Sequence, residues 1–251
     1  MTITVHSHDG ITRLRLDRPE RRNAFNGEMV IQLHAGIVGA IEDQACRCIV
    51  IDGAGDHFCA GRDLQAFSEE TPLSDIISGD DLWADIFRLL DESDLPSISV
   101  VKGYAYAGGF TLAMGCDFVL ADRTAQFQVS EMRHNFPAAI NTPVLSKLLG
   151  PRLALELAVL GETVTADRLY SMGLVNRLVE DAQALEQELK AFTKTIVSHD
   201  KIAIGQTKRL NRVTQQNNLS DALNMGSLIN TQAALSGKFA SAGKSLKNRK
   251  N

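Results

Sequence analysis

The sequence predicts an α/β fold, and three observations lead to that prediction. Short apolar runs rich in β-branched residues alternate with longer segments whose apolar residues recur at helical spacing. Two of these runs, 48–52 and 98–101, are each followed by a glycine turn and then by helix-compatible sequence. The chain has 251 residues, 44% of them hydrophobic, which is ample for a buried core.

The N-terminal elements carry the clearest local signals. An Asp-Gly pair at 9–10 between two apolar runs favours a tight hairpin turn. Asn26 is suited to cap a helix whose apolar residues (Val30, Leu33, Ile37, Ile41) fall on one face. The segment 65–81 is polar and acidic and is expected to form a mobile loop or a frayed helix. The elements expected in order are strands over 2–5, 11–16, 48–52, 98–101, 118–121, 125–129 and 174–179, and helices after Asn26 and over 82–90, 110–114, 144–149, 153–160, 165–172 and from about 181 onward.

The length allows one α/β domain with a tail, and we expect a core domain over residues 1–195 and a helical C-terminal region over 196–251. The net charge of −4 argues against a nucleic-acid partner. No apolar run reaches the roughly 18 residues that a membrane helix needs, and the N-terminus lacks the features of a signal peptide. The four cysteines match no zinc pattern, so no metal site is expected, and reduced thiols suit a cytoplasmic protein.

The two glycine segments suggest a site for a developing negative charge. Gly108 and Gly109 stand at the mouth of a helix, where backbone N–H groups lack intrahelical partners. A plain β-to-α turn explains that segment equally well, but Ala60-Gly61 repeats the scheme after an earlier strand. Two N–H groups from small residues, converging on one oxygen, would form an oxyanion hole.

Other phosphate-binding and nucleophile motifs are absent or incomplete. Residues 53–58, GAGDHF, begin like a dinucleotide fingerprint but have phenylalanine where the third glycine belongs. The sequence contains no G-x-x-x-x-G-K-[ST] motif and no G-x-S-x-G motif. Nucleotide triphosphate binding and serine hydrolysis are therefore disfavoured.

Five segments, in this order and spacing, resemble the crotonase superfamily of enoyl-CoA hydratases and isomerases: DRPERRNAF, GAGDHFCAGRDL, GYAYAGGFTLAMGCDFVLA, a glutamate after a strand, and GLVNRLV. The resemblance covers roughly residues 11–180. It implies a spiral of repeated ββα units with a helical C-terminal region that mediates trimerisation, as a homotrimer or a dimer of trimers. It also implies an acyl-CoA substrate whose thioester is stabilised as an enolate.

By position, the resemblance assigns roles to particular residues. The N–H groups of Ala60 and Gly108 would hold the thioester oxygen, and Arg22 is a candidate phosphate contact. Coenzyme A would arrive as part of the substrate, with no separate cofactor. The adenine and pantetheine would contact a short segment and one earlier residue: Ala60, Gly61, Arg62, Asp63 and Leu64, together with Ala24.

The carboxylates depart from the family pattern. Hydratases of the family use two glutamates; Glu131 stands at one of these positions and Thr111 at the other. One carboxylate suits the transfer of a proton from C2 to C4 of a 3-enoyl thioester, which places isomerisation ahead of hydration. The alternatives are a decarboxylase or hydrolase of acyl-CoA on the same scaffold, and an inert CoA- or RNA-binding paralogue.

Overall fold

The computed structural model describes residues 2–66, 68 and 70–248. The chain divides into two compact units, Met1–Lys201 and Ile202–Asn251. The boundary predicted at 195/196 falls near the end of the last helix of the first unit, α7 (Ala182–Ser198). The first unit contains both glycine segments and Glu131.

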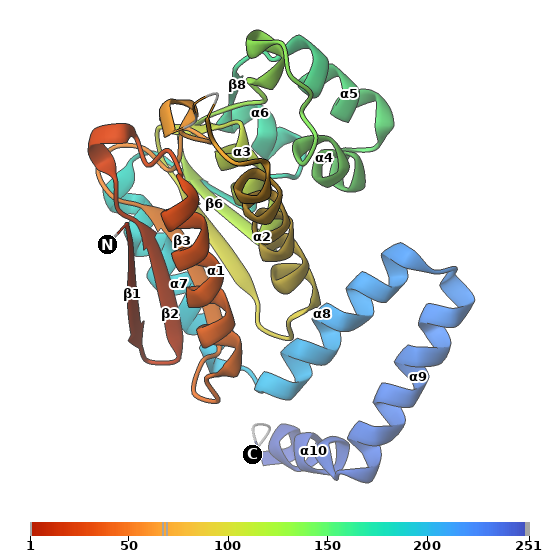
Figure 1. Cartoon of the computed structure of the whole chain (residues 1–251). Coiled ribbons are helices and arrows are strands. Elements are labelled where there is room, and N and C mark those ends of the chain that lie inside the picture. The colour runs from red at the N-terminus through yellow and green to blue at the C-terminus, as the bar shows by residue number, and fades with distance from the viewer. Residues whose placement is uncertain (1, 67, 69, 249–251) are drawn as a thin grey trace. The chain divides into compact units, whose positions relative to one another are not determined.

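A six-stranded sheet forms the centre of the first unit, in the order β1-β2-β3-β4-β6-β9 (Figure 1). The hairpin β1–β2 is antiparallel, as predicted, and the other neighbours pair in parallel. Its turn places Asp9 and Gly10 at positive φ. The strands are β1 (Ile3–His8), β2 (Ile11–Leu16), β3 (Cys48–Gly53), β4 (Ser97–Val101), β6 (Phe118–Asp122) and β9 (Arg177–Val179).

A smaller sheet carries the site residues. It joins β5 (Tyr104–Tyr106) to β7 (Gln126–Gln128) in parallel, and β7 to β8 (Val164–Thr165) antiparallel. β5 was not predicted, because it is short and lies directly between two glycine turns. It leads into α3, and β7 leads toward Glu131, so their parallel pairing brings the two segments together.

The helices follow the predicted order, with one difference in extent. α2 (Leu73–Glu92) begins just after Pro72, well before the predicted start at residue 82. Its first half exposes acidic residues, which made this stretch resemble a loop; residues 67 and 69 lie outside the described residues. The others are α1 (Gly27–Glu42), α3 (Gly108–Gly115), α4 (Asn141–Leu149), α5 (Pro151–Leu160) and α6 (Ala166–Ser171), with 3-10 turns at Pro19–Arg21 (η1), Leu64–Ala66 (η2) and Glu131–His134 (η3).

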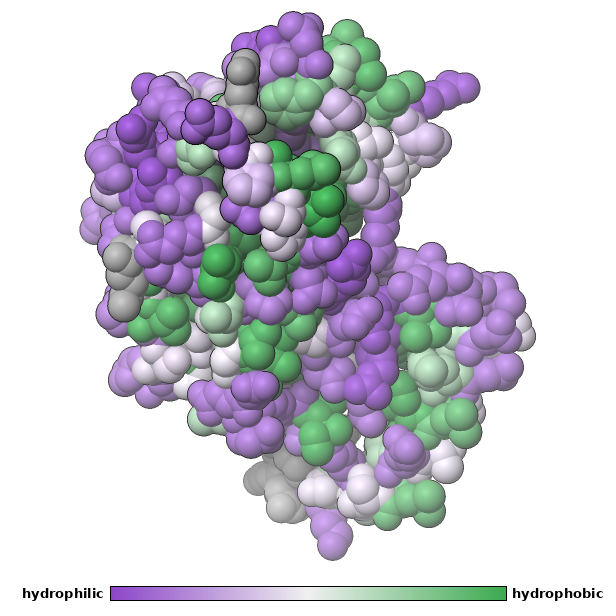
Figure 2. All heavy atoms as spheres, viewed as in Figure 1, coloured by the Kyte–Doolittle hydropathy of each residue, from purple (hydrophilic) through white to green (hydrophobic). Residues whose placement is uncertain are grey.

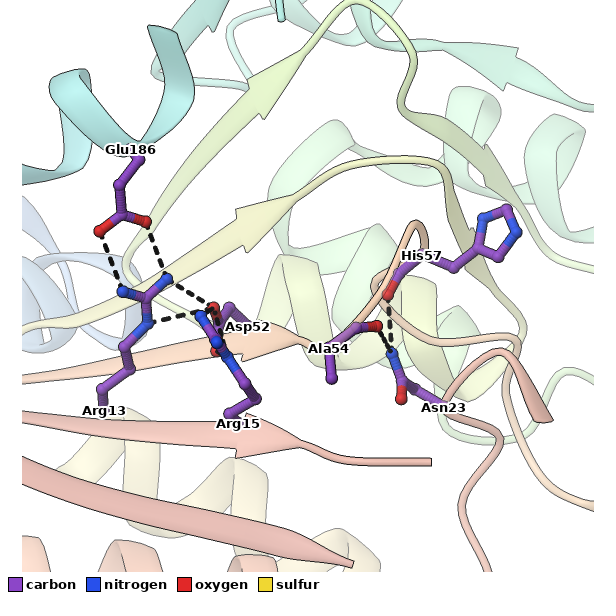
Figure 3. A network of polar contacts seen from close by, with 7 residues as sticks. All are labelled: Arg13, Arg15, Asn23, Asp52, Ala54, His57 and Glu186. Atoms are coloured by element: carbon purple, nitrogen blue, oxygen red, sulfur yellow. Dashed lines mark hydrogen bonds and ion pairs between the residues drawn. The ribbon is translucent and has the colours of Figure 1, made fainter. Parts of the chain in front are cut away.

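The two faces of the large sheet are covered differently. On β2, Leu14 and Leu16 are buried on the side of α1, while Arg13 and Arg15 point to the opposite face. There both arginines bind the nearly buried carboxylate of Asp52 at 2.6 Å, and Arg13 also pairs with Glu186 of α7 (Figure 3). A buried carboxylate is tolerated here because two cations and several hydrogen bonds compensate its lost hydration.

The second unit consists of α8 (Lys201–Gln216), α9 (Leu219–Leu235) and α10 (Lys238–Asn248). It leaves large apolar side chains at its surface, seen as green patches in Figure 2. Four leucines of α9 are more than 60% exposed: Leu219, Leu223, Leu228 and Leu235. Within the described residues, no helix is both long enough and apolar enough to cross a membrane.

Candidate active site

Gly108 begins α3 with its backbone N–H unengaged. Among the described residues, no hydrogen-bond acceptor contacts this N–H. The preceding residue, Ala107, has φ 48° and ψ −123°, a conformation that a residue with a side chain rarely adopts. Two hydrogen bonds hold Ala107 in this conformation. Its N–H donates to the carbonyl of Gln128 (2.8 Å), and its carbonyl accepts from the N–H of Phe110 (2.9 Å). The pairing of β5 with β7 thus sets the direction of the Gly108 N–H.

Packing, rather than φ, explains why position 108 is glycine. Its φ is not in the left-handed region, but an ideal Cβ would lie 2.5 Å from Cε1 of Phe25 and 3.3 Å from Trp83. Phe25 and Trp83 stack with ring centroids 4.2 Å apart. A side chain at Gly108 therefore displaces this aromatic pair, a constraint that the sequence did not reveal.

The structure corrects the predicted role of Ala60. Its N–H donates to the carbonyl of Arg22 at 3.0 Å, so it is already part of a main-chain bond and does not face an open site. The backbone N–H of Phe25 donates to the carbonyl of Gly61, and the carbonyl of Phe25 accepts from the N–H of Asp63, both at 2.9 Å. In this parallel bridge the N–H of the intervening Arg62 points to the side away from Phe25.

Gly61 brings the two glycine segments together. It has φ +93°, which favours glycine, and an ideal Cβ there would lie 2.7 Å from the Ala107 Cβ and 3.4 Å from the Gly108 N. Asn23 supports the same loop by donating to the carbonyls of Ala54 (2.9 Å) and His57 (2.7 Å), as Figure 3 shows. The predicted convergence of the segments is thus present, although Ala60 does not provide the donor.

The other predicted binding residues have varied surroundings. Asp63 pairs with Arg18 at 3.1 Å and is mostly buried, which indicates a role in holding the loop. Arg62 forms an ion pair with Asp80 of α2 and lies over the Phe25 ring. Three more remain accessible: Arg22, exposed above the Tyr104 ring; Ala24, partly buried; and Leu64, 46% exposed.

Glu131 is a buried carboxylate in η3, directly after β7. It is 9% exposed, and its Oε1 accepts a hydrogen bond of 2.5 Å from Nδ2 of Asn141. Its Oε2 is buried and has no hydrogen-bond partner among the described residues. Burial raises the pKa of Glu131 above its ordinary value, while the backbone N–H groups of residues 130 and 131, the bond from Asn141 and the nearby His134 act to lower it. A carboxylate with a raised pKa and one oxygen without a hydrogen-bond partner among the described residues is suited to accept and return a proton.

Thr111 and Asn141 connect α3 to Glu131. The Thr111 hydroxyl donates to Oδ1 of Asn141, and both residues are 1% exposed. Thr111 lies one turn after Gly108, so the connection places Glu131 near the helix N-terminus. No sequence motif marks Asn141 as a functional residue. Within the described residues, no group of histidine, cysteine or acidic side chains is arranged to hold a metal ion.

Comparison with known proteins identifies the family of the chain. The model of the enoyl-CoA hydratase/isomerase family matches residues 6–241. The chain belongs to the enoyl-CoA hydratase/isomerase family. The crotonase-like fold predicted from the sequence is thereby confirmed, as is membership of a family of enzymes.

Relatives within the hydratase/isomerase family are named for different activities. A 1,2-epoxyphenylacetyl-CoA isomerase from Escherichia coli is 30% identical over 227 residues, covering 89% of this chain and 86% of the relative. A crotonyl-CoA hydratase from Syntrophomonas wolfei is 28% identical, with the same coverage. The crystal structure of an enoyl-CoA hydratase from Mycobacterium smegmatis superimposes with a TM-score of 0.89 at 28% identity, covering 97% of both chains.

Proposed function

We propose that the protein is an enoyl-CoA isomerase that moves the double bond of a 3-enoyl-CoA to position 2. The observation that carries this proposal is that Glu131 is a buried carboxylate beside the start of α3, combined with Thr111 at the second carboxylate position. Hydration requires a water to be positioned and deprotonated, whereas isomerisation requires one group that carries a proton between two carbons.

The proposed reaction has two proton transfers. Glu131 takes a proton from C2, the C–H electron pair moves toward the thioester carbonyl, and a dienolate forms. The same carboxyl group then returns the proton to C4 as the electrons move back and form the 2,3 double bond. The raised pKa of Glu131 favours the first step, because a stronger base takes the C2 proton more readily, and the protonated acid so formed supplies the proton for the second step.

We propose that the thioester oxygen accepts hydrogen bonds from the backbone N–H groups of Gly108 and Arg62. Gly108 starts a helix, so the helix dipole adds partial positive charge at this point. The bridge to Phe25 directs the Arg62 N–H away from that residue, and the adjacent Gly61 contacts the Ala107-Gly108 turn. Both donors belong to the backbone, as expected of a preorganised oxyanion site.

Coenzyme A is proposed to enter as part of the substrate, with no separate cofactor. The segment from Gly61 to Leu64, with Ala24 beside it, is proposed to contact the adenine and pantetheine. Arg22 is exposed and available to a phosphate. A cytoplasmic location is proposed because the four cysteines are free and buried.

A substrate comparison tests the reaction assignment. The enzyme should convert 3-hexenoyl-CoA to the 2-enoyl product faster than it hydrates crotonyl-CoA, measured by absorbance of the conjugated thioester and by product chromatography. Hydration is the second candidate, favoured by the relative named crotonyl-CoA hydratase. Brisk hydration with no isomerisation would contradict the proposal. Release of CO₂ or free CoA instead would identify the decarboxylase or hydrolase alternative, and CoA binding without turnover the inert one.

The protein is also expected to assemble as a trimer or a dimer of trimers. Exposed leucines on α9 would be buried in such an assembly, at about 25 cal/mol per Å² of apolar surface removed from water. Light scattering at micromolar concentration should give a mass of three or six chains. Leu228→Glu, which puts a charge at a 68% exposed position, should lower that mass, whereas Ser227→Glu on the same helix serves as the matched control. A monomeric wild-type protein would refute the prediction.

A further inference from the structure

A chain of buried hydrogen bonds runs from α3 to Glu131. The Thr111 hydroxyl donates to Oδ1 of Asn141, and Nδ2 of Asn141 donates to Oε1 of Glu131 at 2.5 Å. All three side chains are at least nine-tenths buried. An unpaired polar atom in such surroundings is costly, so the three groups stabilise one arrangement of the amide.

The chemistry of the groups determines which way the Asn141 amide faces. An ionised carboxylate only accepts hydrogen bonds, so Asn141 must present its NH₂ to Glu131. Its Oδ1 then needs a donor, and the Thr111 hydroxyl supplies one. With the amide reversed, two acceptors would meet at Glu131. The hydroxyl at position 111 thus selects the amide orientation that stabilises the charged form of the base.

The two oxygens of Glu131 are consequently not equivalent. Oε1 is occupied by Asn141, while Oε2 is buried without a partner among the described residues. We propose that Asn141 is a positioning residue, held by Thr111, which reserves Oε1 of Glu131 as an acceptor and leaves Oε2 as the oxygen that carries the proton. Thr111 therefore holds the Asn141 amide in place, in addition to leaving the site with one carboxylate.

This inference rests on the proposed isomerase function for its chemical meaning. As the C2–H bond breaks, an Oε2–H bond forms, and the C–H electron pair passes to the thioester carbonyl. The Oε2–H bond then breaks as the C4–H bond forms, and the carboxylate is restored. Throughout, Oε1 keeps the hydrogen bond from Asn141, so the amide does not need to turn between the two transfers.

The bond from Asn141 and the backbone N–H groups of residues 130 and 131 all lower the pKa of Glu131, so Asn141 is one of several local influences on its titration. His134, on the same turn, lowers the pKa of Glu131. On α5, which packs against η3, the charged residues Arg152 and Glu156 are exposed. On α4, Lys147 pairs with Asp91. α3 contains no charged residue.

Titration of Glu131 in matched variants tests the inference. Asn141→Leu, close in size but without a donor, should raise the pKa of Glu131 by about one to two pH units, because a bond to the charged form is lost. Thr111→Val should shift it in the same direction by less, and Thr111→Ser should return it toward the wild-type value. Thr142→Val is the control, since the Thr142 hydroxyl donates to the Ala138 carbonyl at 2.7 Å instead.

For each variant, the titration of Glu131 and the pH profile of turnover are measured. Carbon-13 NMR of glutamate-labelled protein reports the titration without turnover, with the Glu131 signal assigned by its loss in Glu131→Gln. The pH profile of 3-hexenoyl-CoA isomerisation should show an ascending limb displaced to higher pH by the same amount, with about tenfold lower turnover per unit on that limb.

The possible results separate the positioning role from the reaction. Lower thermal stability with an unchanged Glu131 titration in Asn141→Leu and Thr111→Val would overturn the inference. The shifted titration in a protein that does not isomerise 3-hexenoyl-CoA would support the hydrogen-bond chain and contradict the proposed reaction. If Asn141→Leu does not fold, Thr111→Val decides, because valine matches threonine in volume and lacks only the hydroxyl, which Thr111→Ser retains.

Discussion

Glu131→Gln should reduce isomerase turnover by about 10²–10⁴-fold, the range attributed to general acid–base catalysis. Glutamine keeps the size of the side chain and an oxygen that can accept from Asn141, but it cannot take a proton from C2. Binding of CoA should persist, because the proposed contacts at Gly61–Leu64 and the Gly108 N–H do not involve this side chain. Steady-state kinetics and isothermal calorimetry measure the two quantities.

The pH dependence provides a further check on the role of Glu131. Its pKa is raised by burial, so the ionised base accumulates only above that value, and the ascending limb should lie above the ordinary range of a glutamate. The same shift stabilises the native protein at low pH, and this contribution is lost as pH rises through the folded-state pKa. Glu131→Gln should therefore be at least as thermostable as the wild type at pH 7.

A matched control separates the loss of the base from the loss of a charge. Glu162→Gln makes the same substitution at an exposed glutamate and should retain turnover. An active Glu131→Gln enzyme with normal folding would show that another group moves the proton. That result would contradict the single-base mechanism directly.

Gly108→Val should reduce turnover by at least about 10²–10³-fold, the effect of losing one oxyanion donor. The N–H remains in this variant, but the new Cβ would lie 2.5 Å from the Phe25 ring, so the helix mouth or the Phe25–Trp83 pair must move. Overpacking of this kind costs about 1–3 kcal/mol of stability, which a thermal melt would detect.

The control is Gly39→Val in α1, where an added Cβ meets nothing within 4 Å. This variant should stay active, apart from a small loss of helix stability. Gly108→Ala tests the same site with the smallest side chain and should lie between wild type and valine. If folded Gly108→Ala and Gly108→Val were both as active as the wild type, the oxyanion donor would have to be elsewhere.

The sequence predicted the hairpin, the Asn26 cap and the alternation of strands and helices because these depend on local patterns. It placed the start of α2 too late, since the acidic residues after Pro72 conceal a helix that packs only in its second half. Local sequence also gave no means of choosing among the N–H groups of residues 60–64. That choice depends on pairing with Arg22 and Phe25, which are distant in sequence.

Asn141 illustrates a different limit of sequence-based prediction. Its role requires knowing that α4 packs against α3 and that its first residue lies between Thr111 and Glu131. Neither spacing nor residue type distinguishes Asn141 from Asn135, which ends η3 in a left-handed conformation. The glycine segments were recognisable because short motifs contain them, whereas the hydrogen-bond chain exists only in three dimensions.

The backbone origin of the Gly108 donor has a consequence for how such an enzyme changes over evolution. The N–H is positioned by main-chain pairing of β5 with β7, whereas the proposed proton transfer would depend on side chains from α3, η3 and α4. Substitutions at positions 111, 131 and 141 can therefore alter the reaction without rebuilding the anion-binding turn. If the proposed roles hold, a lineage could exchange one reaction for another through a few point mutations, because the residues proposed to hold the thioester oxygen are encoded separately from those proposed to direct protons.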